Sequence, residues 1–170
     1  GVVEVARSHF GFREDARMRA HVDDGRRFIE RSGRRYDIIF LDAFGTDSVP
    51  YQLVTREFLA GVSRALTPRG VVIGNIWGRD SNPLYDSMVR TYQAVYDEVY
   101  TVDVHGAGNK IVVALPWKSK LTRENLIRQS RQLTRELPLR SDLGDIVERG
   151  IHRVGAEGAK GRILTDAGRP

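Results

Sequence analysis

One aspartate ends an apolar run, at a position where a carboxylate can do chemistry. Residues 36–42 read YDIIFLD, so Asp42 follows the run 38–41 directly, and a turn-rich segment continues to Pro50. A continuous apolar run is typical of a parallel strand that helices cover on both faces. Because open α/β sheets bind ligands at the carboxyl ends of their strands, Asp42 is a candidate catalytic residue. The alternative is a strand-end cap or turn residue, and spacing alone does not separate the two.

A second acid lies ahead of an expected helix. Asp24 precedes Gly25 and the apolar pair Phe28 and Ile29 in the segment HVDDGRRFI. An acidic residue before a periodic apolar run can cap the N-terminus of a helix. We therefore expect a helix over residues 24–33.

The elements that must position these acids alternate along the chain. Apolar periodicity and turn signals predict helices over 2–10, 24–33, within 56–70 and within 81–99, and strands over 17–22, 36–42, 71–77, 99–104 and 109–115. The last two strands are separated by GAG, which predicts an antiparallel hairpin. Asn75 and Trp77 end the strand 71–77 at the same edge as Asp42. The pattern predicts a doubly wound α/β sheet with an antiparallel edge hairpin in residues 1–117.

The remaining residues, 118–170, have a different character. The segment 121–137 has an amphipathic helical pattern that Pro138 ends. We expect this part to be a helical C-terminal extension of the first domain.

Composition excludes several classes of function. The chain has 170 residues, 41% hydrophobic and 29% charged, enough for a domain with a core. No apolar run approaches the roughly 20 residues that span a bilayer, so we expect no membrane partner. The start GVVEVARSHF lacks a signal-peptide pattern, and the chain has no cysteine. These features favour a cytoplasmic protein.

The charge of +5 does not predict a nucleic-acid partner. Phosphate binding needs clustered basic residues. In the densest run, RRFIERSGRR, Arg27, Arg31 and Arg34 have the spacing of a solvated helix face. The histidines lack metal-ligand spacing and no G-x-S-x-G motif occurs, so we expect neither a metal centre nor a serine nucleophile.

Three motifs in order resemble one known family. HVDDGRRFI, then YDIIFLDAFGTDSVPYQLVTREFLAGVSRALTPRGVVIGNIW, then GNKIVVAL are similar to segments of the spermidine synthase family of aminopropyltransferases. The segment ILTDAGRP is a weaker match to that family's C-terminal signature. The resemblance covers residues 2–116.

The resemblance implies a Rossmann-like fold of the class I methyltransferase type. It also implies transfer of an aminopropyl group from decarboxylated S-adenosylmethionine to an amine, usually putrescine, which leaves methylthioadenosine. By that resemblance Asp24 and Gly25 contact the adenine and Asp42 deprotonates or orients the amine. Gln52 lies in the loop that covers the active site.

The proposed role of Asp42 is chemically sound. A protonated amine has no lone pair, so it cannot attack the carbon next to the sulfonium until a base removes a proton. A carboxylate can accept that proton and also bind the cationic amine. It can align the nitrogen with the attacked carbon, which supplies much of the catalysis of a displacement.

The active-site turn departs from the family pattern, Asp-Ser/Thr-Ser/Thr-Asp-Pro. Ala43 and Phe44 replace the hydroxyl residues, and Gly45 replaces the second acid. Asp47 can substitute for that acid if the loop is re-routed. Phe44 makes the amine pocket more apolar, which weakens the prediction of putrescine as substrate.

The family's Gly-rich nucleoside loop and ribose-binding acid precede the helix matched by residues 2–10. We therefore expect either a piece of a longer protein or a relative with a rearranged sheet. A sheet without its central strands exposes apolar surface, which predicts a homo-oligomer. The alternative functions are methyl transfer from S-adenosylmethionine and a non-catalytic module for nucleoside binding or subunit interaction.

Overall fold

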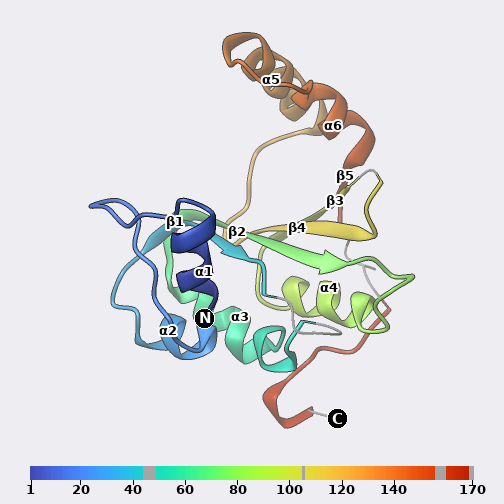
Figure 1. Ribbon diagram of the computed structural model, residues 1–170. Helices are drawn as coiled ribbons and strands as arrows, with labels where there is room; N and C mark the ends of the chain where they lie inside the picture. The colour runs from blue at the N-terminus through green and yellow to red at the C-terminus, as the bar shows by residue number, and fades with distance from the viewer. Residues whose placement is uncertain (44–48, 105, 156–159, 169–170) are drawn as a thin grey trace.

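The chain forms one mixed β-sheet with helices packed against it. The computed structural model describes residues 1–43, 49–104, 106–155 and 160–168 (Figure 1). Among these residues the sheet has the strand order β1-β2-β4-β3-β5. The strands are β1 (Tyr36–Leu41), β2 (Leu66–Trp77), β3 (Glu98–Asp103), β4 (Asn109–Leu115) and β5 (Ile151–Arg153).

The helices connect and flank these strands. They are α1 (Val2–His9), α2 (Gly25–Arg31), α3 (Arg56–Arg64), α4 (Tyr85–Gln93), α5 (Arg123–Glu136) and α6 (Leu143–Gly150), with the short 3₁₀ helices η1 (Tyr51–Leu53) and η2 (Asp166–Gly168). β1 pairs with β2 in parallel, whereas β4 runs antiparallel to both β2 and β3. This mixed sheet, with its antiparallel hairpin, confirms the predicted α/β class.

The core lies between the sheet and the two helices α3 and α4, which sit below the sheet in Figure 1. Leu59 and Val62 of α3 are completely buried, as are Val72 of β2 and Val112 of β4. Burying one such side chain contributes roughly 1.5–3 kcal/mol, so these contacts fix α3 on the sheet. Thr55 caps α3 by accepting a hydrogen bond from the Phe58 amide, at 3.3 Å.

The expectation that β1 is buried on both faces is wrong for the described chain. Ile39 is only 8% exposed, but its neighbours Ile38 and Phe40 are 50% and 68% exposed. Successive side chains of a strand point to opposite faces, and α3 and α4 cover one face only. α1 does not cover the other face, because none of its residues is buried.

The predicted strand over residues 17–22 is absent. The carboxylate of Asp15 accepts hydrogen bonds from the amides of Arg17, at 2.7 Å, and Met18, at 2.8 Å. The carboxylate of Glu14 accepts another from the Ala20 amide, at 2.9 Å. These local side-chain bonds take up backbone groups that a strand ladder would use, and they favour a turn.

The C-terminal part contributes to the sheet and to the core. The helix α5 lies within the predicted range, and with α6 it projects away from the sheet at the top of Figure 1. α6 and β5 were not expected; Asp142 caps α6 by accepting from the Gly144 amide, and β5 pairs with β3. Leu164 is completely buried in the core. The division into domains at residue 117 stays a prediction.

The burial of Leu164 predicts that the C-terminal segment stabilises the whole fold. Leu164→Ala should lower the free energy of unfolding by about 2–4 kcal/mol, because it leaves a cavity between α3 and α4. Urea denaturation followed by circular dichroism measures the change. Leu139→Ala, at a leucine that is 43% exposed, is the matched control and should cost much less. Equal effects of the two variants would show that residue 164 is not part of the core.

Candidate active site at the carboxyl edge of the sheet

Asp42 lies where the prediction placed it, at the carboxyl end of β1. The parallel register pairs Leu41 with Gly74, so Asp42 comes next to Asn75 of β2. The Asn75 Nδ2 group donates a hydrogen bond to Asp42 Oδ1, at 3.1 Å. The Asn75 Oδ1 atom in turn accepts from Asn109 Nδ2 at the start of β4, at 3.0 Å. Asp42 itself is exposed.

A small apolar cavity lies next to this edge. It has a volume of about 30 Å³ and is lined by Leu41, Ala43, Asn75 and Tyr92, together with residues of the 49–54 segment and the core. Burial raises the pKa of the Tyr92 hydroxyl well above its ordinary value. The lining of this cavity is therefore uncharged, and the exposed carboxylate of Asp42 lies beside two of its lining residues, Leu41 and Ala43, in the chain.

Asp24 caps the helix α2, as one of its two interpretations predicts. Its Oδ1 atom accepts from the Arg27 amide at 3.0 Å. Gly25 follows as the first helical residue, is exposed, and has no heavy atom within 4 Å of the position that a Cβ would occupy. Packing within the described chain therefore does not require glycine at position 25.

Gln52 belongs to η1, and an arginine that was not predicted holds this segment. The Arg26 guanidinium reaches the backbone oxygen of Gln52 at 3.5 Å. The same guanidinium donates to both carboxylate oxygens of Asp166, at 2.8 and 2.6 Å. The Tyr51 hydroxyl lies 2.9 Å from the Gly168 oxygen, so η1 is also fixed to the C-terminal segment. Two signals could have identified Arg26: it follows Asp24-Gly25 directly, and Asp166 lies in ILTDAGRP.

Asp47, Phe44 and Gly45 lie outside the described residues. The structure therefore does not test whether Asp47 takes the place of the second acid. Within the described ranges, no group of three or more His, Asp or Glu side chains is placed to hold a metal ion. In the same part of the chain, no helix combines the length and apolar character needed to cross a membrane.

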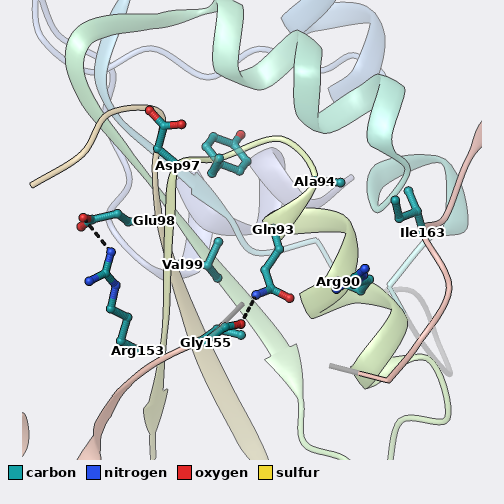
Figure 2. Close-up of a pocket in the computed structure, with 11 residues that line it drawn as sticks. Arg90, Gln93, Ala94, Asp97, Glu98, Val99, Arg153, Gly155 and Ile163 are labelled. Carbon is teal, nitrogen blue, oxygen red and sulfur yellow. Dashed lines mark hydrogen bonds and ion pairs between the residues drawn. The ribbon is translucent and has the colours of Figure 1, made fainter. Parts of the chain in front are cut away.

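The structure also has a larger cavity, of about 650 Å³ (Figure 2). Arg90 and Gln93 of α4 line it, with Asp97, Glu98 and Arg153. Burial opposes the ionisation of Glu98, but hydrogen bonds from Ser119 and Tyr100 and the charge of Arg153 outweigh it and lower its pKa. Glu98 pairs with Leu115, the last residue of β4. Asn109, which is linked to Asp42 through Asn75, is the first residue of that strand. The cavity is therefore at the other end of the sheet from Asp42.

Comparisons with known proteins show that this chain is similar to two kinds of transferase. The family described as the Spermine/spermidine synthase domain matches residues 2–103. A polyamine aminopropyltransferase of Vibrio vulnificus is 33% identical over 118 residues, which are 67% of this chain and 39% of that protein. An eEF1A lysine and N-terminal methyltransferase of Bos taurus is 33% identical over 148 residues, 80% of this chain and 21% of that protein. The chain thus spans less than half the length of these relatives.

Solved structures show the same fold. The crystal structure of human methyltransferase-like protein 13 in complex with SAH has a TM-score of 0.69 at 30% identity, over 82% of this chain and 69% of that one. A probable spermidine synthase from Corynebacterium glutamicum has a TM-score of 0.60 at 23% identity, over 76% of this chain and 50% of that one. These likenesses confirm the predicted Rossmann-like fold of the class I methyltransferase type.

The Arg26–Asp166 ion pair predicts a pH dependence of stability. The hydrogen bonds from Arg26 hold the pKa of Asp166 below its ordinary value of 3.8. A lowered folded-state pKa stabilises the fold above the unfolded-state pKa, and this contribution is lost as the pH falls through the folded-state pKa. Asp166→Asn should therefore lower the free energy of unfolding by about 0.5–1 kcal/mol at pH 7, because the pair is partly exposed. The difference from wild type should shrink below pH 3.8.

Urea denaturation at a series of pH values measures this difference. Asp145→Asn is the control, because its pair with Arg149 is exposed and longer, at 3.6 Å. A difference between Asp166→Asn and wild type that is the same at pH 7 and pH 3 would contradict the assignment to the ion pair.

Proposed function

Because this chain belongs to the Spermine/spermidine synthase domain family, we propose that it carries the amine-activating part of an aminopropyltransferase active site. The proposed reaction transfers an aminopropyl group from decarboxylated S-adenosylmethionine to an amine such as putrescine. The observation that carries the proposal is the exposed carboxylate of Asp42 at the carboxyl end of β1, held by Asn75. The name of the Vibrio vulnificus relative supports the same reaction.

Asp42 supplies the base in this reaction. Its carboxylate binds the protonated amine and removes one proton, which frees the nitrogen lone pair. That lone pair forms the new bond to the carbon next to the sulfonium, the carbon–sulfur bond breaks, and its electrons stay on sulfur in methylthioadenosine. The product carries the transferred group on nitrogen, and the proton leaves Asp42 to solvent.

Asp24 and Gly25 are the proposed nucleoside contacts. One oxygen of Asp24 caps α2, which leaves the other oxygen to accept from the exocyclic amine of adenine. The open space beside Gly25 supports this proposal, because it leaves room for a flat ring against the backbone. We propose Gln52 and Asp47 as residues that contact the amine from the covering segment.

A second candidate function is methyl transfer from S-adenosylmethionine to a protein amine. The match to the bovine eEF1A lysine and N-terminal methyltransferase covers 80% of this chain. A match of that length includes residues of α5, whether the unmatched part lies at the N-terminus or at the C-terminus. The family match ends earlier, at residue 103. Turnover with decarboxylated S-adenosylmethionine rather than S-adenosylmethionine separates the first candidate from the second.

We also propose a homo-oligomer located in the cytoplasm. The exposed apolar side chains Ile38 and Phe40 lie on β1, which is an edge strand of the sheet among the described residues. Unpaired edges and apolar patches favour self-association. Light scattering at micromolar concentration should show at least a dimer, and Phe40→Lys should weaken it. A monomer would contradict the oligomer, and recovery outside the cytoplasm on cell fractionation would contradict the location.

Replacing the two acids tests the division of roles. In the protein from the complete reading frame, Asp42→Asn should lower transfer about 100-fold to 10,000-fold, the usual effect of losing a general base, and should leave nucleoside binding nearly unchanged. Asp24→Asn should weaken nucleoside binding roughly tenfold, because an amide offers one acceptor oxygen instead of two. Asparagine is also a good N-cap, so α2 should remain folded. Calorimetry and a single-turnover transfer assay measure the two effects.

Asp37→Asn is the matched control, because Asp37 is an exposed acid at the other end of the same strand, bonded to Thr67 at 2.9 Å. If Asp42→Asn lowers stability and leaves transfer unchanged, Asp42 is a structural cap. If the wild-type protein binds the nucleoside but transfers nothing to any amine, the non-catalytic module replaces the enzyme.

A further inference from the structure

Three side chains from three segments form a continuous line of hydrogen bonds at the carboxyl edge. Asn109 of β4 donates to Asn75 of β2 at 3.0 Å, and Asn75 donates to Asp42, directly after β1, at 3.1 Å. Asn75 and Asn109 are half-buried, whereas Asp42 is exposed. The line therefore runs from two central strands out to the carboxylate.

The carboxylate fixes the direction of every bond in this line. An ionised carboxylate only accepts hydrogen bonds, so Asn75 must present its Nδ2 group to Asp42. The Oδ1 atom of Asn75 then points the other way and requires a donor, which is Nδ2 of Asn109. The amide of Asn75 has one orientation that satisfies both of its neighbours. Asn109 thus holds the orientation of Asn75, and Asn75 holds that of Asp42.

The charges of these residues also suit a cationic substrate. Asn75 and Asn109 are neutral, so they hold the carboxylate without cancelling its charge. The nearest lysine along β4, Lys110, pairs with Asp103 at 2.5 Å. An arginine or lysine in place of Asn75 would neutralise Asp42 and repel a protonated amine.

We propose that Asn75 and Asn109 are positioning residues that act on the substrate amine through Asp42. Asn75 occupies Oδ1 of Asp42, which leaves Oδ2 to take the amine proton and aligns the nitrogen for attack. This inference rests on the proposed function. It adds that the side-chain amides of two strand residues hold the base.

The kinetic test uses single and double variants in the protein from the complete reading frame. Asn75→Ala should lower kcat about 10-fold to 100-fold with little change in the KM for the nucleoside, because misplacement of a catalytic group affects the reaction step. Asn109→Ala should lower kcat less, by roughly threefold to tenfold, since it acts through Asn75. In the Asn75→Ala background, Asn109→Ala should have no further effect. Asn125→Ala, on the projecting helix α5, is the control and should be unchanged.

A second measurement does not depend on activity. In ¹⁵N–¹H spectra, Asp42→Ala should shift the side-chain amide signals of both Asn75 and Asn109, whereas Asp37→Ala should shift neither. An unmoved Asn109 signal would overturn the proposal, as would wild-type kcat in Asn75→Ala. A full effect of Asn109→Ala in the Asn75→Ala background would do the same. If Asp42→Asn itself keeps wild-type transfer, the proposed function fails instead, and the spectra still decide whether the line of bonds exists.

Discussion

The parallel pairing of β1 with β2 is the constraint on which the candidate site depends. The register that sets Leu41 beside Gly74 brings Asp42 to Asn75 one residue later. Gly74 belongs to the same constraint, because a Cβ there would lie 2.5 Å from the Tyr92 hydroxyl of α4. The glycine lets the helix approach the strand closely just before the residue that holds the carboxylate. A side chain at this position would disturb the core and the site together.

The two halves of the candidate site are held by different kinds of interaction. Asp42 is placed by the pairing of β1 with β2 and bonded by the side-chain amide of Asn75, which Asn109 of β4 bonds in turn. Asp24 and Gly25 owe their place to a local helix cap, whereas η1 is held at long range by Arg26 and the Tyr51 hydroxyl. Arg26 follows Gly25 directly and bonds the backbone of Gln52 in η1. Its side chain therefore joins the proposed nucleoside contacts to η1.

Helices cover one face of the sheet, whereas β1 is exposed on the other face. α3 and α4 bury one face and, with Leu164, form the core. The other face of β1 exposes Ile38 and Phe40. Stability therefore comes from the helix-covered face. The exposed side of β1 is surface available for further chain or for another subunit.

The sequence alone determined the elements whose signals are local. Apolar runs and caps predicted β1, the core of β2, the helices α1 to α5 and the β3–β4 hairpin. The position of Asp42 at a strand end followed from that pattern. The sequence also offered Asp24 as a cap, which the structure confirms. Tertiary structure decided what depends on partners distant in the chain. It left β1 exposed on one face and added β5 to the sheet. The missing strand over 17–22 has a local cause instead, because the side chains of Glu14 and Asp15 bond the nearby backbone. The sequence placed Asn75 at the same edge as Asp42, and Arg26 and Asp166 in family-like segments. It did not predict the line from Asn109 to Asp42 or the Arg26–Asp166 pair, because each joins residues far apart in sequence and periodicity carries no information about such contacts.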